Sequence, residues 1–191
     1  MAVRNAQSPS QPDPPRLGAR DDESLRAALG EAGRAVRRYL FGLCGDWHEA
    51  EDLAQEALLR AWRKRHSFDG RAGVRTWIFA IARNHWLDRL RRRRLRPQEE
   101  PMDQPLPATD SQLPPPVIAQ RAELAAAIGE AVARLPTEQR EALALRESGG
   151  LTFSQIGHLL GVPSATVKSR VRYALMKLAD ELKPFRRELE S

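Results

Sequence analysis

A proline-rich stretch in the middle of the chain, PQEEPMDQPLPATDSQLPPP, limits what the sequence can fold into. Residues 97–116 contain seven prolines and four acidic residues, but no lysine, arginine or glycine. Proline lacks an amide hydrogen and has a fixed φ, so at this density the backbone favours an extended, semi-rigid form over a helix or a sheet. The stretch therefore predicts a flexible linker, over 97–117, between two separate parts of the 191-residue chain.

The part before the linker has the pattern of a small helical domain. Residues 1–20 hold four prolines and almost no large apolar side chains, which is typical of a disordered tail. Apolar residues then recur at helical spacing over 22–44, 46–62 and 76–94. We therefore expect one helical domain over 21–96.

The predicted helix 46–62 has the clearest pattern in the chain. Asp46 is suited to cap it, and Glu49, three residues later, suggests a capping box. The face opposite its apolar stripe is acidic, with no basic residue before Arg60, and comprises Glu51, Asp52, Gln55 and Glu56. Phosphate would repel this face. The pattern alone leaves open whether it binds a basic protein or is only solvated.

The part after the linker predicts four further helices, over 118–134, 137–148, 152–160 and 164–182. Thr137 is the expected cap of the second. No segment has the alternation of a strand, so the fold class is all-α, with two small helical domains joined by the linker. The second domain is expected over 118–183, followed by a C-terminal tail over 184–191.

The segment LTFSQIGHLLGVPSATVKSRVRYALMKL has the features of a helix-turn-helix. Gly157 is small where two helices approach, Gly161 supplies the turn, and Val162 fills the space between the helices. The expected buried stripe of the second helix comprises Val167, Val171, Leu175 and Leu178. Its other face carries hydroxyls and cations, and no acid occurs over 164–177. Such a face suits base edges and phosphates.

The positive charge of the chain is concentrated in one place. Seven arginines and one aspartate lie within 83–96, and the remaining residues are balanced at 24 basic and 24 acidic. Aromatic residues occur in and before this segment: Phe68, Trp77, Phe79 and Trp86. Aromatics beside cations suit the stacking of unpaired bases. For Trp77 and Phe79, a simple role in the core is equally compatible with the pattern.

Several classes of function are not indicated. Cys44 is the single cysteine, which excludes an intrachain disulfide and a paired-cysteine metal site. We expect no metal site, no cofactor and no catalytic residues. Neither a signal peptide nor a membrane-spanning run is evident, so we expect a cytoplasmic protein without membrane insertion.

Three stretches of the sequence together resemble a known family. AEDLAQEALLRAWRKRHSFDG and VRTWIFAIARNHWLDRLRRRR resemble region 2 of the bacterial extracytoplasmic function (ECF) sigma factors of the sigma-70 family. LPTEQREALALRESGGLTFSQIGHLLGVPSATVKSRVRYALMKL resembles their region 4. The resemblance implies a transcription initiation factor that binds core RNA polymerase, directs it to promoters and is held inactive by an anti-sigma factor.

The resemblance also implies roles for particular residues. Contacts with the β′ clamp of the polymerase would come from Glu51, Asp52, Gln55, Glu56 and Arg60. Contacts with the −10 promoter element would come from Phe68, Asp69, Gly70, Arg75, Trp77, Arg83, Asn84 and Arg91. The −35 element would be read by Ser164, Thr166, Lys168, Ser169, Arg170, Arg172 and Tyr173. Region 4 would also meet the β flap, and the acidic linker would lie near the RNA path.

Two other functions compete with this interpretation. A helix-turn-helix regulator of another class would bind duplex DNA without docking on polymerase. A nuclease would use the carboxylates of helix 46–62 to hold a metal, but no converging set of further ligands is visible.

Overall fold

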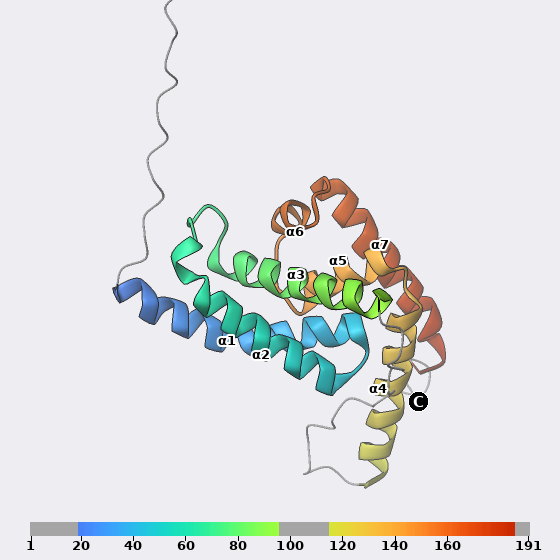
Figure 1. The fold of residues 1–191 in the computed structure, drawn as a ribbon. Helices are drawn as coiled ribbons and strands as arrows, with labels where there is room; N and C mark the ends of the chain where they lie inside the picture. Colours follow the sequence, from blue (N-terminus) through green and yellow to red (C-terminus); the bar gives the residue numbers. More distant parts are fainter. Residues whose placement is uncertain (1–18, 96–114, 186–191) are drawn as a thin grey trace, which may run out of the picture.

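The computed structural model describes residues 19–95 and 115–185, which form two groups of helices (Figure 1). The first group contains α1 (Ala19–Cys44), α2 (Trp47–Arg63), a short 3-10 helix η1 (Arg65–Ser67) and α3 (Val74–Leu95). The second contains α4 (Pro115–Arg134), α5 (Thr137–Glu147), α6 (Phe153–Leu160) and α7 (Ser164–Glu181). No strand occurs within these residues, which confirms the all-α fold class.

The helix boundaries differ from the predicted ones mainly beside the linker. α4 begins at Pro115, not at residue 118, so Pro115 and Pro116 lie in its first turn. A first turn tolerates proline because its amides have no partner within the helix. The N-terminal tail and most of the linker lie outside the described residues, as do the acidic residues Glu99, Glu100, Asp103 and Asp110.

An alanine-rich stripe on α2 lets it pack closely against α1 and α3. Ala50, Ala54, Ala57 and Ala61 are buried, as is Leu53. Small side chains on one face allow neighbouring helices to approach, and the burial removes apolar surface from water. The predicted stripe of this helix is therefore the one that forms the core.

Capping fixes where α2 begins, but the expected capping box does not form. Asp46 Oδ1 accepts a hydrogen bond of 2.7 Å from the backbone N–H of Glu49. The carboxylate of Glu49 instead pairs with Arg89, at 3.3 Å, and Arg93, at 2.8 Å. Glu49 therefore holds α3 against the start of α2, since the two arginines offer stronger donors than a backbone amide.

The capping of the second group also differs from expectation. Pro136 occupies the N-cap position of α5, so Thr137 is the first helical residue and makes no side-chain cap. A complete capping box forms instead at α6, between Thr152 and Gln155. The segment TFSQ carries the sequence signature of this box.

The helix-turn-helix forms as predicted, apart from one core position. α6 ends at Gly161, whose φ of 69° lies in the left-handed region that favours glycine. Val167, Val171 and Ala174 of α7 are buried, but Leu175 is 48% exposed. The buried stripe continues from Val171 to Ala174, three residues on, and this turns Leu175 away from the core.

The two groups of helices share one hydrophobic core. α5 packs against α1, and buried residues of both belong to a single cluster that includes Val36, Tyr39, Phe79, Leu145 and Ile156. The two expected domains therefore correspond to two groups of helices that pack against each other.

Replacing Gly157 with alanine should destabilise the helix-turn-helix. An added Cβ would lie 2.7 Å from the carbonyl oxygen of Val162, closer than backbone atoms tolerate. We expect Gly157→Ala to lower the free energy of unfolding by about 1–3 kcal/mol in urea denaturation. The control is Gly30→Ala, at an exposed position of α1 where a Cβ meets nothing within 4 Å. This change should stabilise the chain by up to about 1 kcal/mol. Equal effects of the two substitutions would contradict the close approach at Gly157.

Candidate nucleic-acid interface

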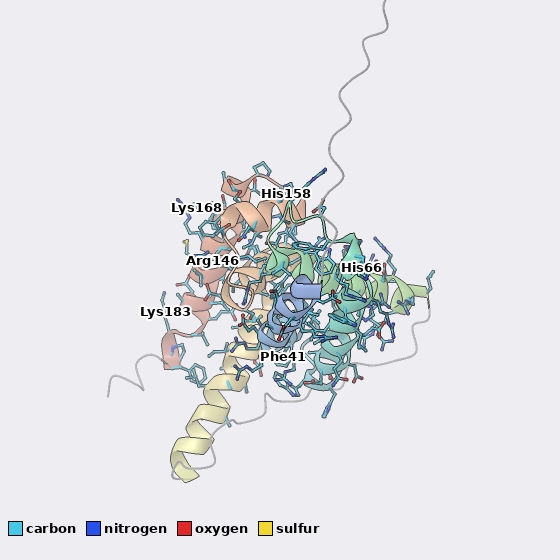
Figure 2. All side chains as sticks on the ribbon, turned by 90° about the vertical axis from the view of Figure 1, so that its left-hand side faces the viewer. Phe41, His66, Arg146, His158, Lys168 and Lys183 are labelled. Carbon is cyan, nitrogen blue, oxygen red and sulfur yellow. The ribbon has the colours of Figure 1, made fainter. Side chains whose placement is uncertain are left out.

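The outer face of α7 carries the polar side chains predicted to read duplex DNA. Ser164, Lys168, Ser169, Arg172 and Tyr173 are exposed, and Thr166 is half-buried. Figure 2 shows Lys168 on the opposite side of the molecule from His66 of η1. The hydroxyl of Ser169 donates to the carbonyl of Ala165 at 2.8 Å, and the guanidinium of Arg172 lies over the Tyr173 ring. The face thus combines exposed cations with hydroxyls, which suits the recognition of duplex DNA.

Arg170 lies differently from the other cations of α7. Its side chain is 22% exposed and its Nη2 lies 3.0 Å from Oε2 of Glu138, on α5. In this position Arg170 ties the recognition helix to α5. Lys168 and Arg172 are the freer cations of the predicted set.

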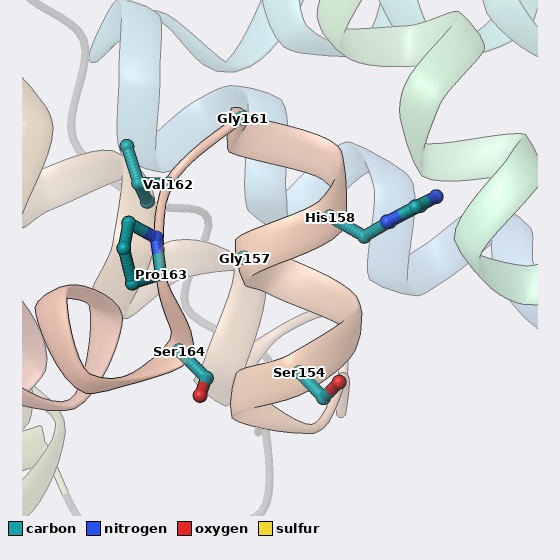
Figure 3. Close-up of a pocket in the computed structure, with 7 residues that line it drawn as sticks. All are labelled: Ser154, Gly157, His158, Gly161, Val162, Pro163 and Ser164. Atoms are coloured by element: carbon teal, nitrogen blue, oxygen red, sulfur yellow. The ribbon is translucent and has the colours of Figure 1, made fainter.

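A groove of about 430 Å³ lies where α6 meets the start of α7 (Figure 3). Its lining includes Gly157, Gly161 and Ser164, and Val162 and Pro163 form the turn beside it. The side chain of His158 projects away from this turn. The close approach at Gly157 lets α6 pack directly against the start of α7.

The loop between η1 and α3, together with the start of α3, holds the aromatic pair Phe68 and Trp77 and the turn Asp69–Gly70, which we call the shelf. The rings of Phe68 and Trp77 pack with centroids 5.2 Å apart, and both residues are half-buried. Asp69 Oδ1 accepts the backbone N–H of Arg71 at 3.0 Å, and Gly70 has a φ of 72°. This turn places two aromatic residues beside exposed polar backbone.

Two of the four candidate stacking aromatics belong to the core. Phe79 is fully buried and Trp86 is 7% exposed. Phe79 packs edge-on against Tyr39, with ring centroids 5.4 Å apart. Phe79 therefore has the alternative role, in the core. Of the four aromatic residues, Phe68 and Trp77 remain available to stack on a base.

Two predicted −10 residues on α3 contact the second group of helices. Arg75 Nε donates to the carbonyl of Gly149 at 2.5 Å. Arg83 Nε donates to Oε1 of Glu141 at 2.8 Å. Asn84 is exposed beside them. The structure therefore brings part of the predicted −10 surface against α5 and the turn that follows it.

Much of the arginine cluster at the end of α3 is neutralised within the first group. Arg89 and Arg93 pair with Glu49, and Arg91 pairs with Asp88 at 2.8 Å. Arg92 and Arg94 are exposed and make no ion pair with any described residue. These two arginines were not in the predicted −10 set.

The outer face of α2 is less uniformly acidic than the sequence suggests. Glu51 pairs with Arg37 and also accepts from Gln55, and Glu56 pairs with Arg60 at 2.8 Å. Hydrogen bonds from these arginines lower the pKa of Glu51 and of Glu56 below the usual range. Asp52 and Gln55 are exposed, and Leu59 beside them is 50% exposed. Leu59 adds an exposed apolar side chain to this face, which the acidic pattern did not indicate.

No cluster of three metal-binding side chains occurs among the described residues. Cys44 Sγ donates to the carbonyl of Asp46, and burial raises the pKa of the thiol to about 11. No helix within the described ranges is long and apolar enough to cross a membrane.

Comparison with known proteins identifies the family. The sequence model of Sigma-70 region 2 matches residues 30–96, and that of Sigma-70 region 4 matches 131–180. ECF RNA polymerase sigma factor RpoE of Cereibacter sphaeroides is 38% identical over 164 residues, which cover 85% of this chain and 88% of that protein. The chain belongs to the ECF RNA polymerase sigma factors. SigL of Mycobacterium tuberculosis is 34% identical over 81% of this chain and 86% of its own length.

Solved structures confirm the fold of this sigma factor. The sigma factor RpoE from Bartonella quintana, in complex with the anti-sigma factor NepR, matches with a TM-score of 0.68 and 24% identity. The match covers 84% of this chain and 98% of that one. CnrH, in complex with the cytosolic domain of CnrY, matches with a TM-score of 0.55 and 24% identity, over 87% of this chain and 90% of that one. Sigma factors are transcription initiation factors and not enzymes. Membership of this family does not favour the alternative of a helix-turn-helix regulator that acts without polymerase.

Losing an exposed cation of α7 should weaken DNA binding through phosphate contacts. We expect Lys168→Ala or Arg172→Ala to reduce the salt dependence of binding to a mixed-sequence duplex by about one unit of slope each. Fluorescence anisotropy over a series of salt concentrations measures this slope. Lys177→Ala, also an exposed cation of α7, is the control and should leave the slope unchanged. If all three variants behave alike, the outer face of α7 is not the binding surface.

Proposed function

We propose that this sigma factor gives core RNA polymerase its promoter specificity and helps to open the −10 DNA. The observation that supports this most directly is that one chain carries an exposed polar and apolar face on α2, at Asp52, Gln55 and Leu59, and a helix with exposed cations, α7. The two belong to region 2 and region 4, in the order of the family. We assign region 2 to 21–96, the linker to 97–117 and region 4 to 118–183.

The outer face of α2 is the proposed docking surface for the β′ clamp. Asp52, Gln55 and Leu59 form its exposed line, while Glu51, Glu56 and Arg60 flank it in fixed ion pairs. The exposed leucine offers apolar area, and the acidic residues select a basic partner and repel DNA. The β flap is the proposed partner of region 4.

The shelf after η1 is the proposed binding site for an unpaired base of the −10 element. Phe68 and Trp77 offer ring faces, and Asp69 and Gly70 form the turn that places them. Extruding a base costs a few kcal/mol, and stacking on aromatic rings offsets about 1–3 kcal/mol of this. Arg75, Arg83, Asn84 and Arg91 would hold the phosphates, and we add Arg92 and Arg94 for the upstream duplex.

The outer face of α7 is the proposed reader of the −35 element. The residues assigned to it are Ser164, Thr166, Lys168, Ser169, Arg170, Arg172 and Tyr173. Lys168 and Arg172 are exposed and can reach bases or phosphates. Arg170 is assigned a positioning part as well, because Glu138 holds it against α5.

We also propose control by an anti-sigma factor, acting in the cytoplasm. Two structures that share the fold of this chain are of a sigma factor bound to the anti-sigma factor NepR and of CnrH bound to the cytosolic domain of CnrY. The acidic residues of the linker keep their proposed place near the RNA path of the polymerase.

Reversing the charge of Asp52 should break docking on the polymerase. We expect Asp52→Lys to reduce co-purification with core polymerase at least about tenfold, since like charges across an interface cost several kcal/mol and about 1.4 kcal/mol already corresponds to a factor of ten. Initiation at specific starts on genomic fragments should fall in parallel. Glu23→Lys, the same change at an exposed position of α1, is the control and should retain both activities. A chain that binds duplex DNA but never co-purifies with polymerase would support the rival regulator.

A further inference from the structure

The residues that lead into the shelf form a cationic run, RKRH, at 63–66. Arg63, Lys64 and His66 are exposed. Arg65 differs from them, because its side chain is only 26% exposed. A charged group that is withdrawn from water needs partners, so the contacts of Arg65 show what holds this part of the chain in place.

Arg65 is bound by two helices at once. Its Nε lies 3.3 Å from Oδ1 of Asp22, on α1, and donates to Oδ2 of the same carboxylate at 3.4 Å. Its Nη1 donates at 3.2 Å to the carbonyl of Trp62, near the end of α2, and its guanidinium lies over the Trp62 ring, 4.6 Å from the centroid. A planar guanidinium can pair with a carboxylate and stack on an aromatic ring at the same time. Arg65 therefore ties η1 to both α1 and α2.

Trp62 is contacted by a second cation, which comes from α1. The guanidinium of Arg26 lies 4.8 Å from the centroid of the Trp62 ring. Asp22 and Arg26 are four residues apart and therefore lie on the same face of α1. The start of α1 thus offers an anion to Arg65 and a cation to Trp62. Both residues of α1 precede residue 30, where the match to the region 2 model begins.

The shelf follows Arg65 directly in the chain. The backbone N–H of Phe68 donates to the carbonyl of Arg65 at 3.2 Å. The backbone N–H and the hydroxyl of Ser67 both donate to the carbonyl of Lys64, at 2.8 and 2.7 Å. These bonds restrict the backbone between Arg65 and Phe68, whose ring packs against Trp77. The place of the Phe68 ring therefore depends on where η1 is anchored.

We propose that Asp22 and Arg65 are positioning residues for the unpaired base of the −10 element. Their ion pair anchors η1, so that Phe68 stands where it can stack on that base. The inference rests on the proposed function, because it takes the shelf as the site of the base. Neither side chain needs to touch the DNA. Without the pair, η1 shifts more freely, and a shelf that must be ordered on binding holds the base more weakly.

The direction of the effect at Asp22 tests this role. If Asp22 acted on DNA by charge alone, removing its charge would strengthen binding, because an anion repels phosphates. We expect the opposite. Core polymerase with the Asp22→Asn chain should bind a fluorescent single strand, the non-template −10 sequence of a promoter that the chain selects, about fivefold more weakly than with the parent. This factor is near the lower end of what one stacked base contributes.

Glu23→Gln is the matched control for Asp22→Asn, since it removes the same charge from the next residue, which is exposed. It should not weaken binding of the single strand. Asp22→Asn should also leave co-purification with core polymerase and duplex binding by α7 unchanged. Unchanged or tighter binding of the single strand by Asp22→Asn would overturn the proposal. A parallel loss of polymerase and duplex binding would overturn it too, because the effect would then be general destabilisation.

The other half of the ion pair should give the same loss. Arg65→Gln should weaken binding of the single strand about fivefold or more, with the salt slope of the parent, because Arg65 holds no phosphate. Arg63→Gln removes the same charge from an exposed position and should bind as the parent does. The double variant Asp22→Asn/Arg65→Gln should bind no more weakly than Arg65→Gln, since both changes break one pair. A smaller salt slope for Arg65→Gln, an equal loss for Arg63→Gln, or additive losses in the double variant would contradict the shared role.

Trp77→Ala distinguishes a failure of this proposal from a failure of the proposed function. If Trp77→Ala weakens binding of the single strand and Asp22→Asn does not, the positioning role is wrong and the shelf stands as the site of the base. If the parent chain with core polymerase binds the single strand no more tightly than core polymerase alone, the proposed function fails and the positioning role fails with it.

Discussion

The arrangement of the molecule depends on Tyr39 of α1, which is buried between α3 and α5. Its ring packs edge-on against Phe79 of α3, and its hydroxyl faces Glu141 of α5. A fully buried tyrosine needs a partner for its hydroxyl, and a nearly buried glutamate needs a cation. Arg83 supplies this cation by pairing with Glu141. Tyr39, Arg83 and Glu141 therefore join α1, α3 and α5 beside the apolar core that these helices share.

Charge is divided among the surfaces so that each suits a different partner. On the outer face of α2, Glu51 and Glu56 are held in ion pairs, while Asp52 and Leu59 are exposed. This face therefore suits contact with a protein better than contact with DNA. The outer face of α7 exposes cations and hydroxyls. The arginines at the end of α3 are partly neutralised by Glu49 and Asp88, so the phosphate-binding capacity there is smaller than the sequence count implies.

The local features of the fold follow from short-range patterns, and the sequence predicts them well. The apolar stripe of α2, the cap at Asp46 and the turn at Gly161 were all predictable, because each depends on residues a few positions apart. The burial of Phe79 and the pairing of Arg83 with Glu141 were not. Both depend on contacts between residues far apart in sequence, Phe79 with Tyr39 of α1 and Arg83 with Glu141 beyond the linker. The exposure of Leu175 was not predictable either, because a shift of one residue in the buried stripe of α7 decides whether Ala174 or Leu175 faces the core.

Promoter opening is the central activity that this structure is proposed to support, and permanganate reactivity of thymines measures it directly. On a promoter selected by the chain, core polymerase with this sigma factor should render thymines of the −10 element reactive at defined positions. Trp77→Ala, which removes one ring of the proposed shelf, should diminish that reactivity while duplex contacts by α7 persist. The same pattern of reactive thymines with core polymerase alone would contradict the account.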